Sequence, residues 1–176
     1  MIRAYFLLLL YPATIFAAKV ESVTVSLDYT DGDTSKRVLH SDVPVEIPDR
    51  GKISTGVNGQ ARVTLKDGTR FDLGPSTTID LQATAPGESR SFSSLLYGKL
   101  KALIPKQTSS QGWGMKVGSA AMGVRGTEFI VEKEPQEGKF LVCTTEGAVA
   151  ISTQKQKEIL VHAGEGVVVN DDGSAE

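Results

Sequence analysis

The stretch that decides the fold is residues 123–131, which reads Gly123-Val124-Arg125-Gly126-Thr127-Glu128-Phe129-Ile130-Val131. Arg125 stands between two glycines, and a run that alternates apolar and polar residues follows directly. Because glycine adopts backbone angles that other residues avoid, the pair predicts a tight bend or a close approach of another backbone. The alternation predicts that a half-buried β-strand begins just after the bend. The guanidinium of Arg125 carries planar donors suited to a carboxylate.

Short alternating runs separated by turn residues continue on both sides of this stretch. Two of the runs meet at Asp67-Gly68, which is a strong hairpin signal. Another run lies between Pro44 and Pro48, and proline favours the edge of a sheet. Many short strands with frequent turns predict one all-β domain of antiparallel strands and hairpins, in the form of a β-roll or a sandwich.

Three further segments need interpretation. Val20 to Leu27 is typical of one strand, and Asp28 to Ser35 is typical of a polar turn around Gly32. Residues 93–104 fit either helical or strand spacing. Gly98 favours the strand, because a glycine costs the interior of a helix about 1 kcal/mol.

The first 18 residues carry one early positive charge and then an apolar run that ends at Ala17-Ala18. This pattern predicts a secretory signal peptide and an exported, periplasmic or secreted protein, with an uncleaved membrane anchor as the alternative. The formal net charge of −2 is not that of a nucleic-acid binder. Cys143 is the only cysteine of the chain, so no intramolecular disulfide is possible.

The ordered motifs resemble the FecR domain, which is named for the periplasmic part of the ferric-citrate regulators. The resemblance covers about Thr55 to Val169. The matching positions are Thr55-Gly56, Gly59, Ala61, Val63, Leu65, Asp67-Gly68-Thr69, Phe71, Leu73, Pro75-Ser76, Ile79, Tyr97-Gly98-Lys99-Leu100, Ala120, Gly123 to Phe129, Glu146-Gly147-Ala148-Val149 and Ala163-Gly164-Glu165.

The resemblance implies an extracytoplasmic all-β domain for signal sensing or protein contact, without catalysis or a cofactor. We therefore expect a signal peptide at 1–18, N-terminal strands of the same domain at 19–54, a FecR-like core at 55–170 and a tail at 171–176. An exported, stand-alone FecR-domain protein is the expectation. Its expected partner is another protein of the bacterial cell envelope, with a small ligand or a cell-wall polysaccharide as the alternative. Membrane contact is expected only through an uncleaved signal segment.

Two residues are candidates for binding. Arg125 suits an anionic ligand, but we expect it rather to pair with an internal carboxylate such as Asp67, Asp72 or Asp80. Arg125→Ala should then lower thermal stability. Trp113 lies in a segment rich in Gly, Ser and Gln, and it is either a contact residue or a side chain folded over the core.

The motif residues, Arg125 among them, are expected to be structural. They are Asp67, Gly68, Gly123, Arg125, Gly126, Thr127, Glu146, Gly147 and Gly164.

No catalytic or metal site is expected from the remaining polar residues. Asp28, Asp31 and Asp33 lack the spacing of a calcium loop, and two histidines with one cysteine do not supply a usual zinc site. Cys143 lies in an apparent strand, where a small half-buried thiol is the common outcome.

Overall fold

The computed structural model describes residues 16–82, 92–106 and 113–176, and almost all of its regular structure is β-strand. The prediction of an all-β domain is confirmed. The elements are β1 (Phe16–Thr24), β2 (Ser26–Asp31), β3 (Thr34–Leu39), the 3₁₀-helix η1 (His40–Asp42), β4 (Val45–Pro48), β5 (Gly51–Thr55), β6 (Gln60–Leu65), β7 (Arg70–Leu73), β8 (Thr78–Gln82), β9 (Phe92–Ile104), β10 (Trp113–Val117), β11 (Ala120–Val124), β12 (Thr127–Lys133), β13 (Lys139–Glu146), β14 (Ala148–Ser152), β15 (Ile159–His162) and β16 (Gly166–Asn170).

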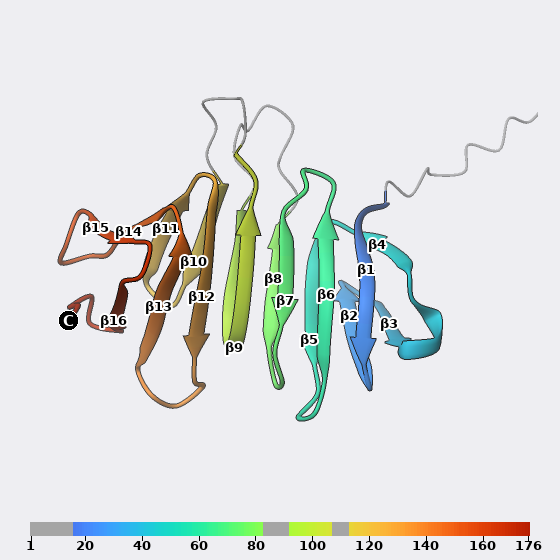
Figure 1. Ribbon diagram of the computed structural model, residues 1–176. Helices are drawn as coiled ribbons and strands as arrows, with labels where there is room; N and C mark the ends of the chain where they lie inside the picture. Colours follow the sequence, from blue (N-terminus) through green and yellow to red (C-terminus); the bar gives the residue numbers. More distant parts are fainter. Residues whose placement is uncertain (1–15, 83–91, 107–112) are drawn as a thin grey trace, which may run out of the picture.

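The strands form two layers, which lie one behind the other in Figure 1. Sheet A has the order β4-β1-β6-β7-β9-β12-β13-β16. Sheet B has the order β3-β2-β5-β8-β9-β10-β11-β14-β15. Neighbouring strands are antiparallel, except for the parallel pair β9 and β10. The chain advances along the molecule from the N-terminal strands at one end to the C-terminal strands at the other (Figure 1).

Strand β9 belongs to both sheets. Its first half pairs with β8 and β10 in sheet B, and its second half, from Gly98 onward, pairs with β7 and β12 in sheet A. The prediction that residues 93–104 form a strand is confirmed. Because one continuous strand joins the layers, both sheets cover a single core.

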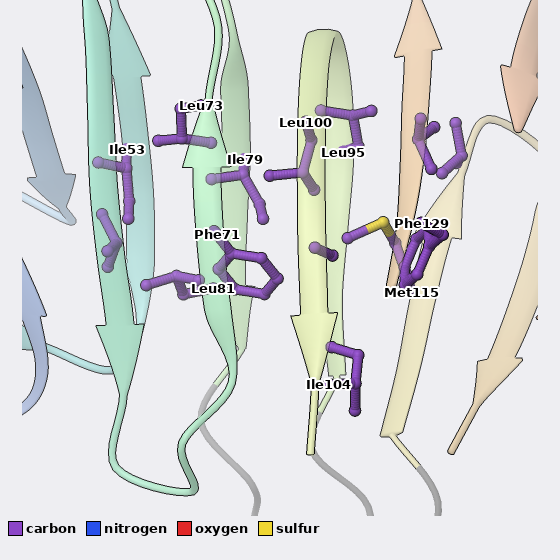
Figure 2. Close-up of a cluster of buried hydrophobic side chains, with 14 of the residues drawn as sticks. Ile53, Phe71, Leu73, Ile79, Leu81, Leu95, Leu100, Ile104, Met115 and Phe129 are labelled. Carbon is purple, nitrogen blue, oxygen red and sulfur yellow. The ribbon is translucent and has the colours of Figure 1, made fainter. Parts of the chain in front are cut away.

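Side chains from the facing surfaces of the two sheets fill this core, as Figure 2 shows for ten labelled residues. The largest buried side chains include Trp113, Phe71, Phe129 and Phe140. Within strands such as β7, β12 and β14, buried residues alternate with exposed or half-buried ones. Period-two alternation therefore places one face of each strand inside, as expected for stacked sheets.

The N-terminal strands differ in two respects from the sequence prediction. The run from Val20 to Leu27 is split at Val25, which has a φ of 71° and is 63% exposed. Val23 and Leu27 are both buried, but they belong to different sheets. The expected polar turn is also shorter, because only two residues, Gly32 and Asp33, separate β2 from β3.

The sequence correctly predicted one hairpin turn and one edge strand. The hairpin through Asp67-Gly68 joins β6 to β7 as predicted. Strand β4, framed by two prolines, ends sheet A as predicted. At the other end of sheet A, the C-terminal residues turn back onto β16, where Val168 and Glu176 exchange two backbone hydrogen bonds of 2.9 and 3.0 Å.

Candidate functional site

The chain passes between the sheets at several points, and the first crossing is built from Thr55, Gly74, Thr77, Gly98 and Lys99. The Thr55 hydroxyl donates to the Gly74 carbonyl (2.6 Å) and accepts from the Thr77 N–H (3.0 Å). The Thr77 hydroxyl accepts from the Lys99 N–H at 3.0 Å. Where the backbone leaves a sheet, its N–H and C=O groups lose their partners on the neighbouring strand. These buried hydroxyls form hydrogen bonds with them instead.

Gly98 is required at this crossing because another backbone lies against it. Its φ is 98°, and an added Cβ would overlap the Cα of Thr77 and lie 2.7 Å from the Ser76 carbonyl oxygen. A side chain here would meet both strain and a clash with main-chain atoms that have little room to move.

A second crossing contains residues 123–131, with Arg125 between two glycines. Arg125 and Gly126 connect β11 of sheet B to β12 of sheet A, which confirms the predicted bend followed by a strand. The buried Thr127 hydroxyl donates to the carbonyl of Ala148 at 3.0 Å. An added Cβ on Gly147, where φ is 79°, would lie 2.7 Å from the Gly126 carbonyl oxygen. The glycine-rich motifs around residues 126 and 147 therefore pack directly against each other.

The third crossing joins the end of β13 to the turn between β15 and β16. The N–H of Gly164 donates to the carbonyl of Thr144 at 2.8 Å, and the N–H of Thr144 donates to the carbonyl of Glu165 at 3.0 Å. The carboxylate of Glu165 accepts from the N–H of His162 at 2.8 Å. We use "the crossings" below for these three places.

The expectation that Arg125 pairs with an internal carboxylate is wrong. Its side chain is exposed, and it forms no ion pair among the described residues. The carboxylate of Asp72 is instead held by Arg62, at 2.6 and 3.0 Å. The carboxylate of Asp67 accepts from the N–H of Thr69 within its own turn. The register of the β6–β7 hairpin sets the partner of Asp72, and the spacing of the charges does not show that register.

Trp113 was interpreted either as a contact residue or as a side chain folded over the core. In the structure it lies in the core. The side chain is 1% exposed, and its ring centroid lies 5.5 Å from that of Phe71. Trp113 is the first residue of β10, and its side chain lies on the buried face of that strand. It is not available as a first contact for a partner.

Glu128, which the motif contains, does form a paired site on the outer face of sheet A. Its carboxylate lies 2.9 Å from the Lys101 ammonium and accepts from the Thr145 hydroxyl at 2.8 Å. These hydrogen bonds hold the pKa of Glu128 below its ordinary value, because they stabilise the charged form.

The outer face of sheet A also carries a surface groove of about 580 Å³. It runs over β12, β13, the turn between them and β16. We call it the acidic groove, and its lining includes Glu132, Glu134, Glu137, Lys139, Leu141 and Val168.

A smaller depression of about 200 Å³ lies over β1, β6 and β7, beside the Arg62–Asp72 ion pair. Within the described ranges, no three of the side chains His, Cys, Asp and Glu are arranged to hold a metal ion. The described part of the chain also contains no helix long and apolar enough to cross a membrane.

Comparison with known families identifies the fold. The model of the family described as FecR protein matches residues 51–150, more than half of the chain. The chain belongs to the FecR family. The first two crossings lie inside this match, whereas Gly164 and Glu165 of the third lie beyond it.

Solved structures agree with this assignment at the level of the fold. Two crystal structures of a "putative anti-sigma factor" from Parabacteroides distasonis superpose on this FecR protein with a TM-score of 0.63 and 18% sequence identity. Each match covers 71% of this chain and 57% of that chain. The chain thus spans little more than half the length of that protein. No curated protein matches the chain in sequence.

The acidic groove was not foreseen from the sequence of this FecR protein, although a signal for it is present. In β13 and β16, Leu141 and Val168 occupy positions that alternation assigns to the solvent face, since Phe140, Val142 and Val169 are buried. Apolar residues at solvent-face positions mark a surface patch only once the core face of each strand is known.

Proposed function

We propose that this FecR protein is an exported, non-catalytic module of the bacterial cell envelope that senses a signal through contact with another protein. Membership of the FecR family is the observation that carries the proposal. The described residues support it in a second way. The buried hydroxyls of Thr55, Thr77 and Thr127 serve the crossings, and the acidic groove offers an exposed surface of mixed apolar and charged character. Protein-contact surfaces commonly combine these features.

In this proposal, the apolar N-terminal segment that ends at Ala18 is the signal peptide that directs export. The structure adds a condition, because Ala18 is buried and pairs with Ile47 and Leu65 at the start of β1. Cleavage after Ala18 would leave Lys19 to Thr24 to hold β1 in the sheet.

Fractionation of a Gram-negative host that produces the full chain tests the location. We expect a periplasmic protein whose intact mass lacks an N-terminal segment of about 18 residues. A full-length protein in the cytoplasmic fraction would contradict export.

The signalling role needs a separate test in the native bacterium. Transcripts are compared between the wild type, a deletion strain, and deletion strains that carry either the intact chain or a chain lacking residues 1–18. We expect a set of transcripts that changes on deletion and returns only with the export-competent chain. Equal profiles in all four strains would contradict a signalling role.

A further inference from the structure

Two of the strands under the acidic groove, β13 and β16, carry apolar residues on both faces. Strand β13 contains the run Phe140-Leu141-Val142-Cys143, and β16 contains Val167-Val168-Val169. Strands of a sheet with one face in water normally alternate, whereas continuous apolar runs are typical of strands covered on both faces. Leu141 is nevertheless 37% exposed.

The apolar positions lie together because of the register of sheet A. Glu132 of β12, Leu141 of β13 and Val168 of β16 form one continuous row across three strands. The floor of the groove is therefore aliphatic on β13 and β16 and carboxylate on β12, and the turn between β12 and β13 forms one wall. Its volume of about 580 Å³ accommodates several side chains of a partner.

The charges around this floor are mainly negative. Glu132 is held by Lys99 at 3.0 Å, and Glu137 lies 3.7 Å from Lys139 with both side chains at least half exposed. Glu134 is exposed and forms no ion pair with another described residue. Three carboxylates and one ammonium line the groove, so a basic occupant would complement it.

We infer that the acidic groove binds a partner protein through an extended segment that carries aliphatic side chains flanked by lysine or arginine. The aliphatic side chains pack on Leu141 and Val168, and the cations reach Glu134 and Glu137. This inference rests on the proposed role in protein contact and specifies the surface and the chemistry of the contact. Salt should weaken the binding, because exposed ion pairs are screened.

The test uses the chain without residues 1–18 and a synthetic heptapeptide probe. The probe has two lysines, two leucines separated by glycine, and two further lysines. Methyl NMR follows the signals of Leu141 and Val168 during titration. We expect saturable shifts at these methyl groups and weaker binding at high salt. A probe with glutamates in place of the lysines should not bind.

Matched variants separate the groove from other exposed residues. Leu141→Ser should weaken binding about tenfold, whereas Leu160→Ser, at a leucine that is 53% exposed on β15, should not change it. The double variant Glu134→Gln, Glu137→Gln should weaken binding about fivefold. Glu46→Gln, Glu158→Gln provides its control, since both carboxylates are exposed and lie outside the groove. Unchanged methyl signals of Ile79 and Leu95, which are buried in the core and do not line the groove, show that the fold of each variant is intact.

Three results would overturn the inference. They are the absence of methyl shifts at Leu141 and Val168, equal binding of the acidic probe, and equal losses in Leu141→Ser and Leu160→Ser. Concentration-dependent shifts of Leu141 without the probe would also count against it, since a second copy of the chain would then occupy the groove. Any of these results leaves the fractionation and transcript tests unaffected, so failure of the groove and failure of the signalling role remain distinguishable.

Discussion

The crossings and the acidic groove share strand β13 but use it in opposite ways. At its C-terminal end, the backbone of Thr144 is locked by hydrogen bonds to Gly164 and Glu165. Nearer its start, Leu141 lies on the outer face and is partly exposed to solvent. The first region has its main-chain groups paired within the fold. The second exposes apolar surface together with the carboxylate of Glu134, which forms no ion pair with another described residue.

The FecR motifs that contain Gly98, Thr127 and Gly147 therefore lie where the chain passes between the two sheets. Gly98, Thr127 and Gly147 are fixed by close backbone contacts and buried hydrogen bonds. Those constraints hold for any function that the fold carries. Specific recognition is therefore to be sought on surfaces that take no part in these contacts, and the acidic groove is such a surface.

The largest effect is expected from Trp113→Ala, which tests whether the start of β10 belongs to the core or to a contact surface. Removing this buried ring beside Phe71 should lower the free energy of unfolding by about 4 kcal/mol. Urea unfolding measures the loss. Trp113 is the only tryptophan, so a blue-shifted emission that acrylamide hardly quenches reports its burial directly in the wild type. A loss below about 1 kcal/mol, with quenchable emission, would place the ring at the surface.

A smaller effect is expected from Thr127→Val within the second crossing. The change keeps the shape of the side chain but removes the hydrogen bond to Ala148, at a cost of about 1–2 kcal/mol in the free energy of unfolding. The neighbouring Arg125→Ala serves as the control and should change it by less than about 0.5 kcal/mol, because Arg125 is exposed. If both variants lost equal free energy of unfolding, Arg125 would be paired inside the protein, as the sequence predicted.

The smallest effect concerns the pH dependence of the Glu128–Lys101 pair. The pKa of Glu128 is lowered in the folded state, so the pair stabilises the fold above the ordinary glutamate pKa of 4.5 and this contribution is lost as the pH falls below that value. At pH 7, Glu128→Gln should lower the free energy of unfolding by about 0.5 kcal/mol. Urea unfolding between pH 7 and pH 3 should show the two curves converging below about pH 4.5. A constant difference across the range would contradict the assignment.

Much of the fold could be predicted from the sequence, because alternation and turn chemistry are local. The hairpin at Asp67-Gly68, the edge strand beside Pro44 and the strand over 93–104 were all found in this way. The corner at Val25 was missed, because the apolar spacing continues through it while the chain changes sheets.

The candidate surfaces could be predicted less well, since they depend on the register between paired strands. The partner of Asp72 is Arg62 rather than Arg125 because the hairpin places these two residues opposite each other. The row that joins Leu141 to Val168 likewise becomes visible only when β13 and β16 are aligned.

The free energies of unfolding of Gly98→Ala and Gly123→Ala, measured side by side in urea, show whether the glycines of the FecR motifs act through close backbone contact at the crossings. Both glycines belong to family motifs, but a Cβ at Gly98 overlaps the backbone at Thr77, whereas a Cβ at Gly123 meets no atom within 4 Å. The structural account predicts a loss of about 3 kcal/mol or more for Gly98→Ala and a change within about 0.5 kcal/mol for Gly123→Ala. Similar values for the two variants would contradict the claim that the signature acts through the crossings.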